Sequence, residues 1–188
     1  MIRSLLCSTY LKNPSGELNN PFSNKNKTQE MEKMIVKNTI LINADRISVW
    51  DALVNPEKTK QYMFGCETVS DWKIGSTLLW QGSYEGKDVV FVKGVIVDIE
   101  PNKLLKYTVI DPASSMPDIP ENYLNVTYEL EEQNGQTNLS VTQDGFEGAA
   151  EGEKRYRDVQ NNGEGWNPIL VEIKKLVEAN LLGGSIKK

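Results

Sequence analysis

Histidine is absent from the 188-residue chain, and no other feature of the composition excludes as many functional classes. Without an imidazole the chain has no Ser-His-Asp or Cys-His nucleophile pair and no histidine-based metal site. Cysteine is scarce as well, because only Cys7 and Cys66 occur. Two cysteines make neither a disulfide framework nor a closed zinc site, and they fit a reducing compartment. The sequence therefore predicts a cytoplasmic protein with no metal and no cofactor.

Positive charge is in deficit, and long apolar runs are missing. The chain has 21 Lys and Arg against 26 Asp and Glu, a net charge of -5, whereas nucleic-acid binders normally carry a basic face. No apolar run approaches the roughly 18 residues that a membrane-spanning helix needs. The Gly-Glu-Gly sequence at 163–165 lacks the lysine and the preceding strand of a phosphate-binding loop. We therefore expect no nucleic-acid partner and no integral membrane association.

The first 33 residues differ in composition from the rest. They are rich in Asn, Ser, Lys and Pro, with too few large apolar residues to offset the entropic cost of ordering. An export signal is one interpretation, but the apolar stretch is short and no small-residue cleavage site follows it. We favour a disordered leader, or a start assigned too early, since Met31 and Met34 stand at the edge of the patterned region.

The patterned region, residues 34–182, has the length of one domain, and residues 183–188 are expected to form a flexible tail. Alternation of apolar and polar residues predicts antiparallel strands with one buried face at 34–43, 66–70, 77–84, 89–100, 103–110, 123–132 and 137–144. Apolar residues at helical spacing predict helices at 44–55, 56–64 and 168–182. The charged segment 147–158 is interpreted as a surface helix, a lid or an inert linker.

The last predicted helix has the widest apolar face of the three. Its stripe consists of Trp166, Ile169, Leu170, Ile173, Leu176, Val177 and Leu181. Pro168 suits the first turn, which makes Asn167 the expected N-cap and lets Trp166 pack on Val171. About 15 residues at 1.5 Å each give roughly 22 Å, enough to cross several strands. We expect this stripe to cover the concave face of the sheet.

Five stretches, in this order, carry a resemblance to a known family. They are VWDALVNPEKTKQYMF (49–64), DWKIGSTLLWQG (71–82), KGVIVDIEPNKLLKYTV (93–109), VTQDGF (141–146) and GWNPILVEIKKLVE (165–178). The chain resembles the START-like (SRPBCC) superfamily and, within it, the family named for the activator of heat shock protein 90 ATPase, in its C-terminal-domain form. The resemblance covers nearly all of residues 34–182.

The resemblance implies an α+β helix-grip fold, as in START and Bet v proteins. In that fold a curved antiparallel sheet wraps around a long C-terminal helix, and two short helices follow the first strand. It also implies a cavity between helix and sheet, in which members of the superfamily bind lipids, sterols or other apolar molecules. Some relatives catalyse cyclisations or dehydrations, so the fold alone does not name a chemistry.

The candidate pocket residues are mainly large side chains near the implied cavity, joined by one polar residue of a strand that could orient a ligand. They are Trp80, Tyr84, Phe91, Tyr107, Tyr128, Gln143, Phe146, Trp166, Leu170 and Ile173. For each of them the alternative role is plain core packing, which is what aromatic residues at such spacing usually do.

Acid–base candidates are few. Asp111, Asp118 and Asp144 lie at strand ends or in loops, and Lys93 lies in a strand. A carboxylate buried at the cavity would have a raised pKa and could act as a general acid or base, but a solvated loop acid is the commoner case. Cys66 has no histidine to activate it and is expected to be unreactive. We assign no catalytic residue.

These observations favour a small START-like domain that binds an apolar or amphipathic small molecule between the sheet and the C-terminal helix. The first alternative is a cyclase- or dehydratase-like enzyme that uses a cavity carboxylate. The second is a chaperone-linked protein, as the family name implies. Known activators pair this domain with a separate chaperone-binding domain, which the 33-residue leader is too short to form, so we rank a chaperone partner last.

Overall fold

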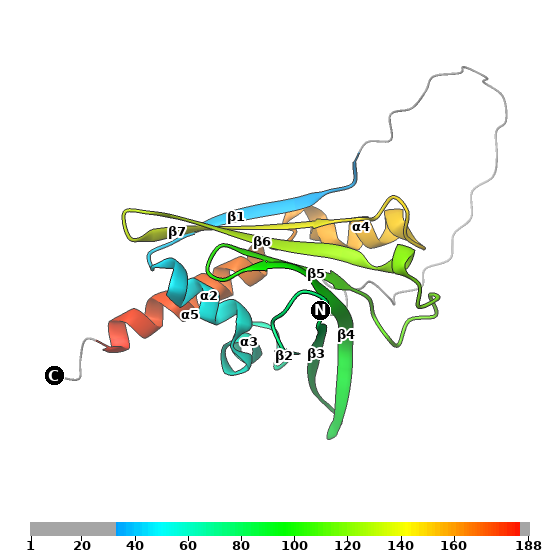
Figure 1. Cartoon of the computed structure of the whole chain (residues 1–188), viewed down its shortest axis with the longest axis horizontal. Coiled ribbons are helices and arrows are strands. Elements are labelled where there is room, and N and C mark those ends of the chain that lie inside the picture. The colour runs from blue at the N-terminus through cyan, green and yellow to red at the C-terminus, as the bar shows by residue number, and fades with distance from the viewer. Residues whose placement is uncertain (1–32, 185–188) are drawn as a thin grey trace, which may run out of the picture.

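A computed structural model describes residues 33–184 of the chain, with side chains as far as residue 179. Seven antiparallel strands form one sheet in the order β1-β7-β6-β5-β4-β3-β2, which curves around the helix α5 (Figure 1). The strands are β1 (Val36–Ile42), β2 (Glu67–Ser70), β3 (Thr77–Tyr84), β4 (Lys87–Glu100), β5 (Leu104–Val109), β6 (Leu124–Gln133) and β7 (Gln136–Asp144). The helices are α2 (Arg46–Val54), α3 (Pro56–Tyr62), α4 (Gly152–Gln160) and α5 (Asn167–Gly184). The predicted helix-grip fold is confirmed.

The two short helices follow β1 and are separated by a single residue that serves both. Asp45 caps α2, because its carboxylate accepts a hydrogen bond from the Ser48 N–H at 2.7 Å. Asn55 ends α2 and begins α3, since its side-chain oxygen accepts from the Glu57 N–H at 3.0 Å. Pro56 occupies the first turn of α3, where its missing N–H costs nothing. This shared cap fixes the angle at which the chain leaves α2.

The strands β6 and β7 show the clearest alternation of burial. Leu124, Val126, Tyr128 and Leu130 of β6 are buried, and so are Leu139, Val141 and Gln143 of β7. Side chains between them point to the other face and are partly or fully exposed. Alternation of this kind places one face of the sheet against α5.

The sheet bends where β4 meets its neighbours. The register shifts between Trp80 and Gln81 in β3, and between Ile96 and Asp98 in β4. Such irregularities bend a strand and increase its twist. Gly94 lies in the same part of β4, where a Cβ atom would stand 1.6 Å from the Thr108 carbonyl oxygen. Only glycine therefore allows β4 and β5 to approach this closely, and the bend carries β3 and β2 around the helix (Figure 1).

The start of α5 differs in detail from the prediction. The Trp166 carbonyl accepts hydrogen bonds from the N–H groups of Ile169 and Leu170, both at 3.0 Å, so Trp166 acts as the cap in place of Asn167. Trp166 is completely buried, whereas Val171 is 38% exposed and faces the surface. The indole packs into the sheet core, which offers it more apolar contact than a staple against its own helix would.

The charged segment predicted at 147–158 overlaps α4, which packs against the rest of the fold. Arg155 is fully buried and donates from Nη1 to the Asn122 carbonyl at 2.9 Å. The ring of Tyr156 meets Phe146 edge-on at 5.4 Å. These contacts attach α4 to the loop before β6 and to the end of β7.

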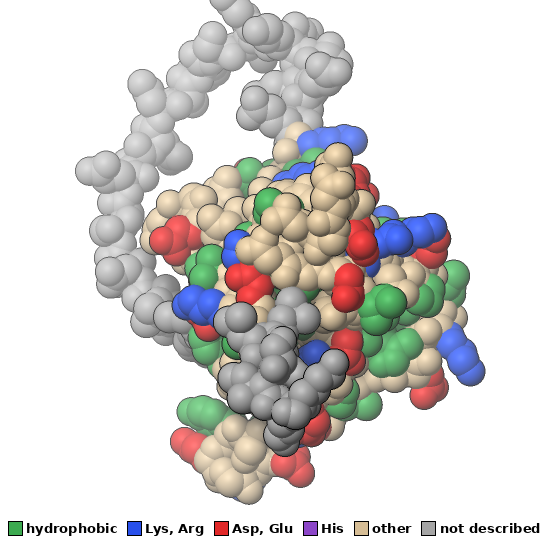
Figure 2. Space-filling view, turned by 90° about the vertical axis from the view of Figure 1, so that its left-hand side faces the viewer, with side chains coloured by type: hydrophobic (Ala, Val, Ile, Leu, Met, Phe, Trp, Pro, Cys, Tyr) green, Lys and Arg blue, Asp and Glu red, His purple; other side chains and the backbone are tan. Residues whose placement is uncertain are grey.

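Acidic and basic side chains are intermingled on one side of the molecule. Figure 2 shows red and blue side chains interspersed with green apolar ones on this side, instead of one broad basic face. No helix in the described part of the chain is long and apolar enough to cross a membrane.

We expect Ile173→Ala to lower the free energy of unfolding by about 2–5 kcal/mol, because Ile173 is fully buried on the sheet-facing side of α5. Lys175→Ala, on the exposed side of the same helix, should change it by less than about 0.5 kcal/mol. Urea unfolding followed by tryptophan fluorescence measures both. Equal effects at the two positions would contradict the packing described for α5.

Candidate functional site

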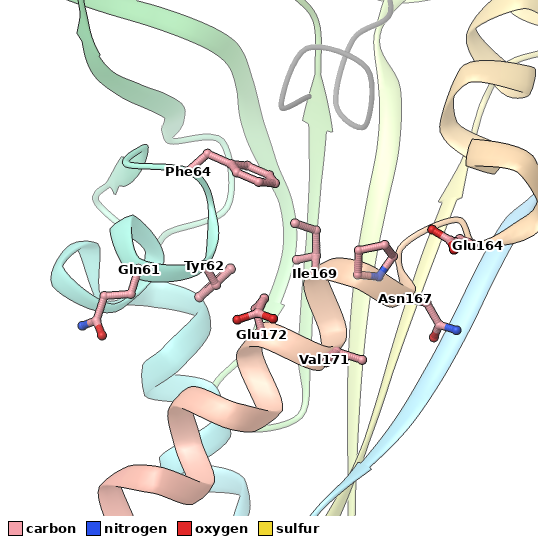
Figure 3. Close-up of a pocket in the computed structure, with 9 residues that line it drawn as sticks. Gln61, Tyr62, Phe64, Glu164, Asn167, Ile169, Val171 and Glu172 are labelled. Atoms are coloured by element: carbon pink, nitrogen blue, oxygen red, sulfur yellow. The ribbon is translucent and has the colours of Figure 1, made fainter.

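An open groove lies between the end of α3 and the first two turns of α5 (Figure 3). Its volume is about 600 Å³, which is in the range of small-molecule sites. The lining residues come from two segments about a hundred residues apart in sequence, and they are Gln61, Tyr62, Phe64, Glu164, Asn167, Pro168, Ile169, Val171 and Glu172. None of the described lining residues belongs to a strand, so the groove lies between two helices and differs in place from the predicted cavity between helix and sheet.

The groove has an apolar floor and an exposed aromatic rim. Tyr62 and Ile169 are buried beneath it, while the Phe64 ring is 55% exposed and extends toward the start of α5 (Figure 3). Phe64 has a φ of 54°, a left-handed conformation that a residue with a bulky side chain rarely adopts. The turn after α3 stabilises this conformation, because the Gly65 N–H donates to the Lys60 carbonyl and the Cys66 N–H donates to the Met63 carbonyl. A strained turn therefore presents an apolar ring to solvent at the mouth of the groove.

Behind the floor, aromatic side chains form a row between sheet and helix. The Tyr107 and Tyr128 rings lie 6.3 Å apart, and Tyr128 meets the Trp166 ring edge-on at 6.1 Å. The Trp166 indole N–H donates to Gln143 Oε1 at 3.1 Å. Tyr107 and Gln143 occupy the same row of the sheet, because each pairs with Val126 between them.

Three buried polar atoms in this row have no hydrogen-bond partner. They are the Trp80 indole nitrogen, the Tyr107 hydroxyl and the amide nitrogen of Gln143, and all three can donate. An unsatisfied buried donor costs about 1–3 kcal/mol, so such atoms in a folded protein require an explanation. Trp80 and Tyr128 lie near enough to the Tyr107 hydroxyl to affect its pKa, although neither meets hydrogen-bond geometry.

Burial sets the protonation of the tyrosines. Desolvation is the main cause that raises the pKa values of Tyr62, Tyr107 and Tyr128 well above the ordinary value for tyrosine. Tyr62 links the two parts of the site. It lines the groove, its hydroxyl donates to the Ala52 carbonyl at 2.9 Å, and its pKa is raised further by Tyr128.

Eight of the ten residues predicted for the pocket are buried in the core. They are Trp80, Tyr107, Tyr128, Gln143, Phe146, Trp166, Leu170 and Ile173. Phe91 is partly buried beside the core, and Tyr84 is 61% exposed next to the turn between β3 and β4. None of the ten lines the described groove, and their contact with a ligand stays a prediction.

The patterns in the sequence did not identify the residues that line the groove. Periodicity marks Ile169 as buried, but Val171 and Glu172 fall on the exposed side of the helical pattern. One signal was available, since Phe64 stands directly before Gly65 at the predicted end of α3, where the turn can leave its side chain outside the core.

The predicted acid–base residues lie elsewhere. Asp118 pairs with Lys93 and accepts the Tyr123 hydroxyl at 2.6 Å, beside a second pocket of about 380 Å³ formed by β3, β4, β5 and Tyr123. The Lys93 ammonium holds the pKa of Asp118 below its ordinary value. Asp144 accepts from the Asn125 amide at 2.8 Å, and the buried Asp111 accepts from the Ala113 N–H at 2.8 Å. None of them lines the groove.

Metal ligation and thiol chemistry receive no support from the described residues. Within them, no three Asp, Glu or Cys side chains cluster as metal ligands would. Cys66 is buried next to β2, and burial raises the pKa of its thiol to about 11. At neutral pH such a thiol is almost entirely protonated, which makes it a poor nucleophile.

Residues 43–178 match the family model described as activator of Hsp90 ATPase homolog 1-like protein. This match covers well over half of the chain. The chain belongs to this family. It is thus a START-like domain of the SRPBCC type, and the resemblance inferred from its motifs is confirmed.

Solved structures agree with this assignment. Protein ChR145 from Cytophaga hutchinsonii is 38% identical, with a TM-score of 0.63 over 80% of this chain and 99% of its own. Protein NE0264 from Nitrosomonas europaea shares the fold at 16% identity, with a TM-score of 0.61 over 81% and 99%. A structure described as the Aha1 dimer from Colwellia psychrerythraea shares it at 16% identity, with a TM-score of 0.54 over 77% and 96%. The comparison with curated proteins finds no match.

The buried tyrosines predict a loss of stability at alkaline pH. The unfolded chain releases tyrosine protons near pH 10, whereas folded Tyr62, Tyr107 and Tyr128 retain theirs. Their contribution is fully present below about pH 9 and is lost as the pH rises further, so the free energy of unfolding should fall from there. Urea unfolding at a series of pH values from 7 to 11 measures this dependence.

Tyr107→Phe isolates the contribution of the Tyr107 hydroxyl to this pH dependence from those of Tyr62 and Tyr128. Because the Tyr107 hydroxyl is buried without a hydrogen-bond partner, its removal should raise the free energy of unfolding at pH 7 by about 1–3 kcal/mol, the cost of an unsatisfied donor. The substitution should also make the free energy of unfolding fall less steeply above about pH 9. Tyr84→Phe, which removes an exposed hydroxyl, is the control and should leave the decline unchanged. An unchanged decline in Tyr107→Phe would contradict the assignment.

Proposed function

We propose that this START-like domain binds a small amphipathic molecule whose apolar part lies in the groove between α3 and α5. The observation that carries the proposal is the groove itself, about 600 Å³ with an apolar floor formed by Tyr62 and Ile169. Ligand sites are typically concave, mostly apolar and edged by a few polar groups. The polar side chains Gln61, Glu164, Asn167 and Glu172 supply such an edge.

Two features of the surroundings support this location. The exposed Phe64 ring is held at the rim in a strained backbone conformation, and strain of this kind clusters at functional sites. Behind Tyr62, the donors of Trp80 and Tyr107 have no partner, and an acceptor oxygen on a ligand would satisfy them if the Tyr62 side chain moved aside. The sequence-derived pocket residues would then form the inner wall of the same site.

The other two functions stay predictions of lower rank. A chaperone-linked role has the description of the family as its support. An enzyme of the cyclase or dehydratase kind would need an acid or base in the site, and Asp111, Asp118 and Asp144 do not line the groove.

Filling the groove tests the proposal. Val171→Trp places a bulky ring on a rim residue that is 38% exposed, so the fold should tolerate it. We expect binding of a neutral fluorescent probe, N-phenyl-1-naphthylamine, to weaken by about tenfold, which corresponds to about 1.4 kcal/mol. Fluorescence titration at equal protein concentrations measures the dissociation constant.

Val97→Trp is the matched control, because Val97 in β4 is 39% exposed and lies away from the groove. It adds the same ring to the surface and should leave probe binding unchanged. Equal affinities of the two variants, or no probe binding by the unmodified protein, would refute the groove as the ligand site.

A further inference from the structure

The charged groups at the groove have one sign. Among the described residues that line it, Glu164 and Glu172 are the only ionisable ones besides Tyr62, and none is a lysine or an arginine. Lys175 approaches from outside and pairs with Glu172 at 2.7 Å. Both partners are more than half exposed, so this pair is worth little and a ligand can replace it.

The first turn of α5 does not offset this negative charge with free N–H groups. The N–H of Asn167 donates to the Glu164 carbonyl at 3.0 Å, and Pro168 has no N–H. The N–H groups of Ile169 and Leu170 both donate to the Trp166 carbonyl. Anions bind at helix N-termini through unpaired N–H groups, and none is left in this turn.

An aromatic ring completes the arrangement. Phe64 extends from the end of α3 toward α5, and Glu172 lies below it on the opposite side of the groove (Figure 3). Cations bind to aromatic faces, and alkylammonium groups are recognised where such rings stand near carboxylates. A carboxylate ligand would meet two like charges and no donor from the helix.

From these contacts we infer that the groove selects an amphiphile with a positively charged group, such as an alkylammonium ion, over one with a carboxylate. The apolar chain lies on Tyr62, Ile169 and Val171, and the cation lies near Phe64 and the carboxylate of Glu172, while Glu164 adds negative charge farther along the rim. This inference rests on the proposed function, because it names the class of ligand for the same groove.

Three ligands with the same chain length but different charge test the inference. Decyltrimethylammonium, decanol and decanoate are compared, below their micelle concentrations, as competitors of bound N-phenyl-1-naphthylamine at low ionic strength. We expect the cation to bind at least about fivefold more tightly than decanoate, the size that one or two partly exposed charge pairs supply. Added salt should reduce this ratio, because it screens the rim carboxylates.

The double variant Glu164→Gln and Glu172→Gln should bring the ratio of cation to anion affinity close to one while decanol binding is unchanged. Glu153→Gln with Glu121→Gln, two acids exposed elsewhere, removes the same charge and controls for the negative charge of the whole protein. Its ratio should stay near that of the unmodified chain.

The outcomes separate the two claims. Decanoate binding as tightly as the cation, or an equal loss of preference in the control variant, overturns the charge selectivity and leaves the groove as a ligand site. Failure of the neutral probe and of all three competitors to bind overturns the proposed function itself.

Discussion

The packing of α5 against the concave sheet is the interaction on which the rest of the molecule depends. Trp166 anchors it at the point where the helix begins. Its backbone N–H donates to Asn38 of β1 at 2.8 Å, its indole N–H donates to Gln143 of β7, and its ring meets Tyr128 of β6. One fully buried residue thus ties the helix to three neighbouring strands. Because these contacts differ in direction, they set both the position and the angle of α5.

The groove follows from that angle. α5 leaves Trp166 in the direction of α3, whose own position is set where the Thr59 hydroxyl accepts the Thr68 N–H of β2 at 3.1 Å. The two helices are therefore attached to opposite edges of the sheet, and their facing side chains do not fill the space between them. Tyr62 closes the bottom of this space, and Phe64 projects over its rim. An apolar cleft remains in a place where close packing would otherwise be expected.

The polar groups of the site are divided by depth. Donors without partners lie in the interior, and the carboxylates stand at the rim, where water or a cation can solvate them. The first turn of α5 has its N–H groups satisfied within the chain, so the helix end adds no anion site. The carboxylates are therefore solvated, whereas the interior row consists of tyrosine, tryptophan and glutamine side chains without charge at neutral pH.

Local patterns in the sequence were sufficient to predict the strands, the two short helices and the apolar stripe of α5, because alternation and helical spacing record which face each element buries. They also supplied the motifs that indicated the family. They did not place the groove, because its walls come from α3 and α5, far apart in the chain, and a groove is the space that distant elements leave unfilled. The same reason explains why the pattern marks Val171 as an ordinary exposed residue and why eight of the ten expected pocket residues are buried in the core. Periodicity predicts which side chains are buried, whereas only the tertiary arrangement decides where two distant helices leave a groove between them.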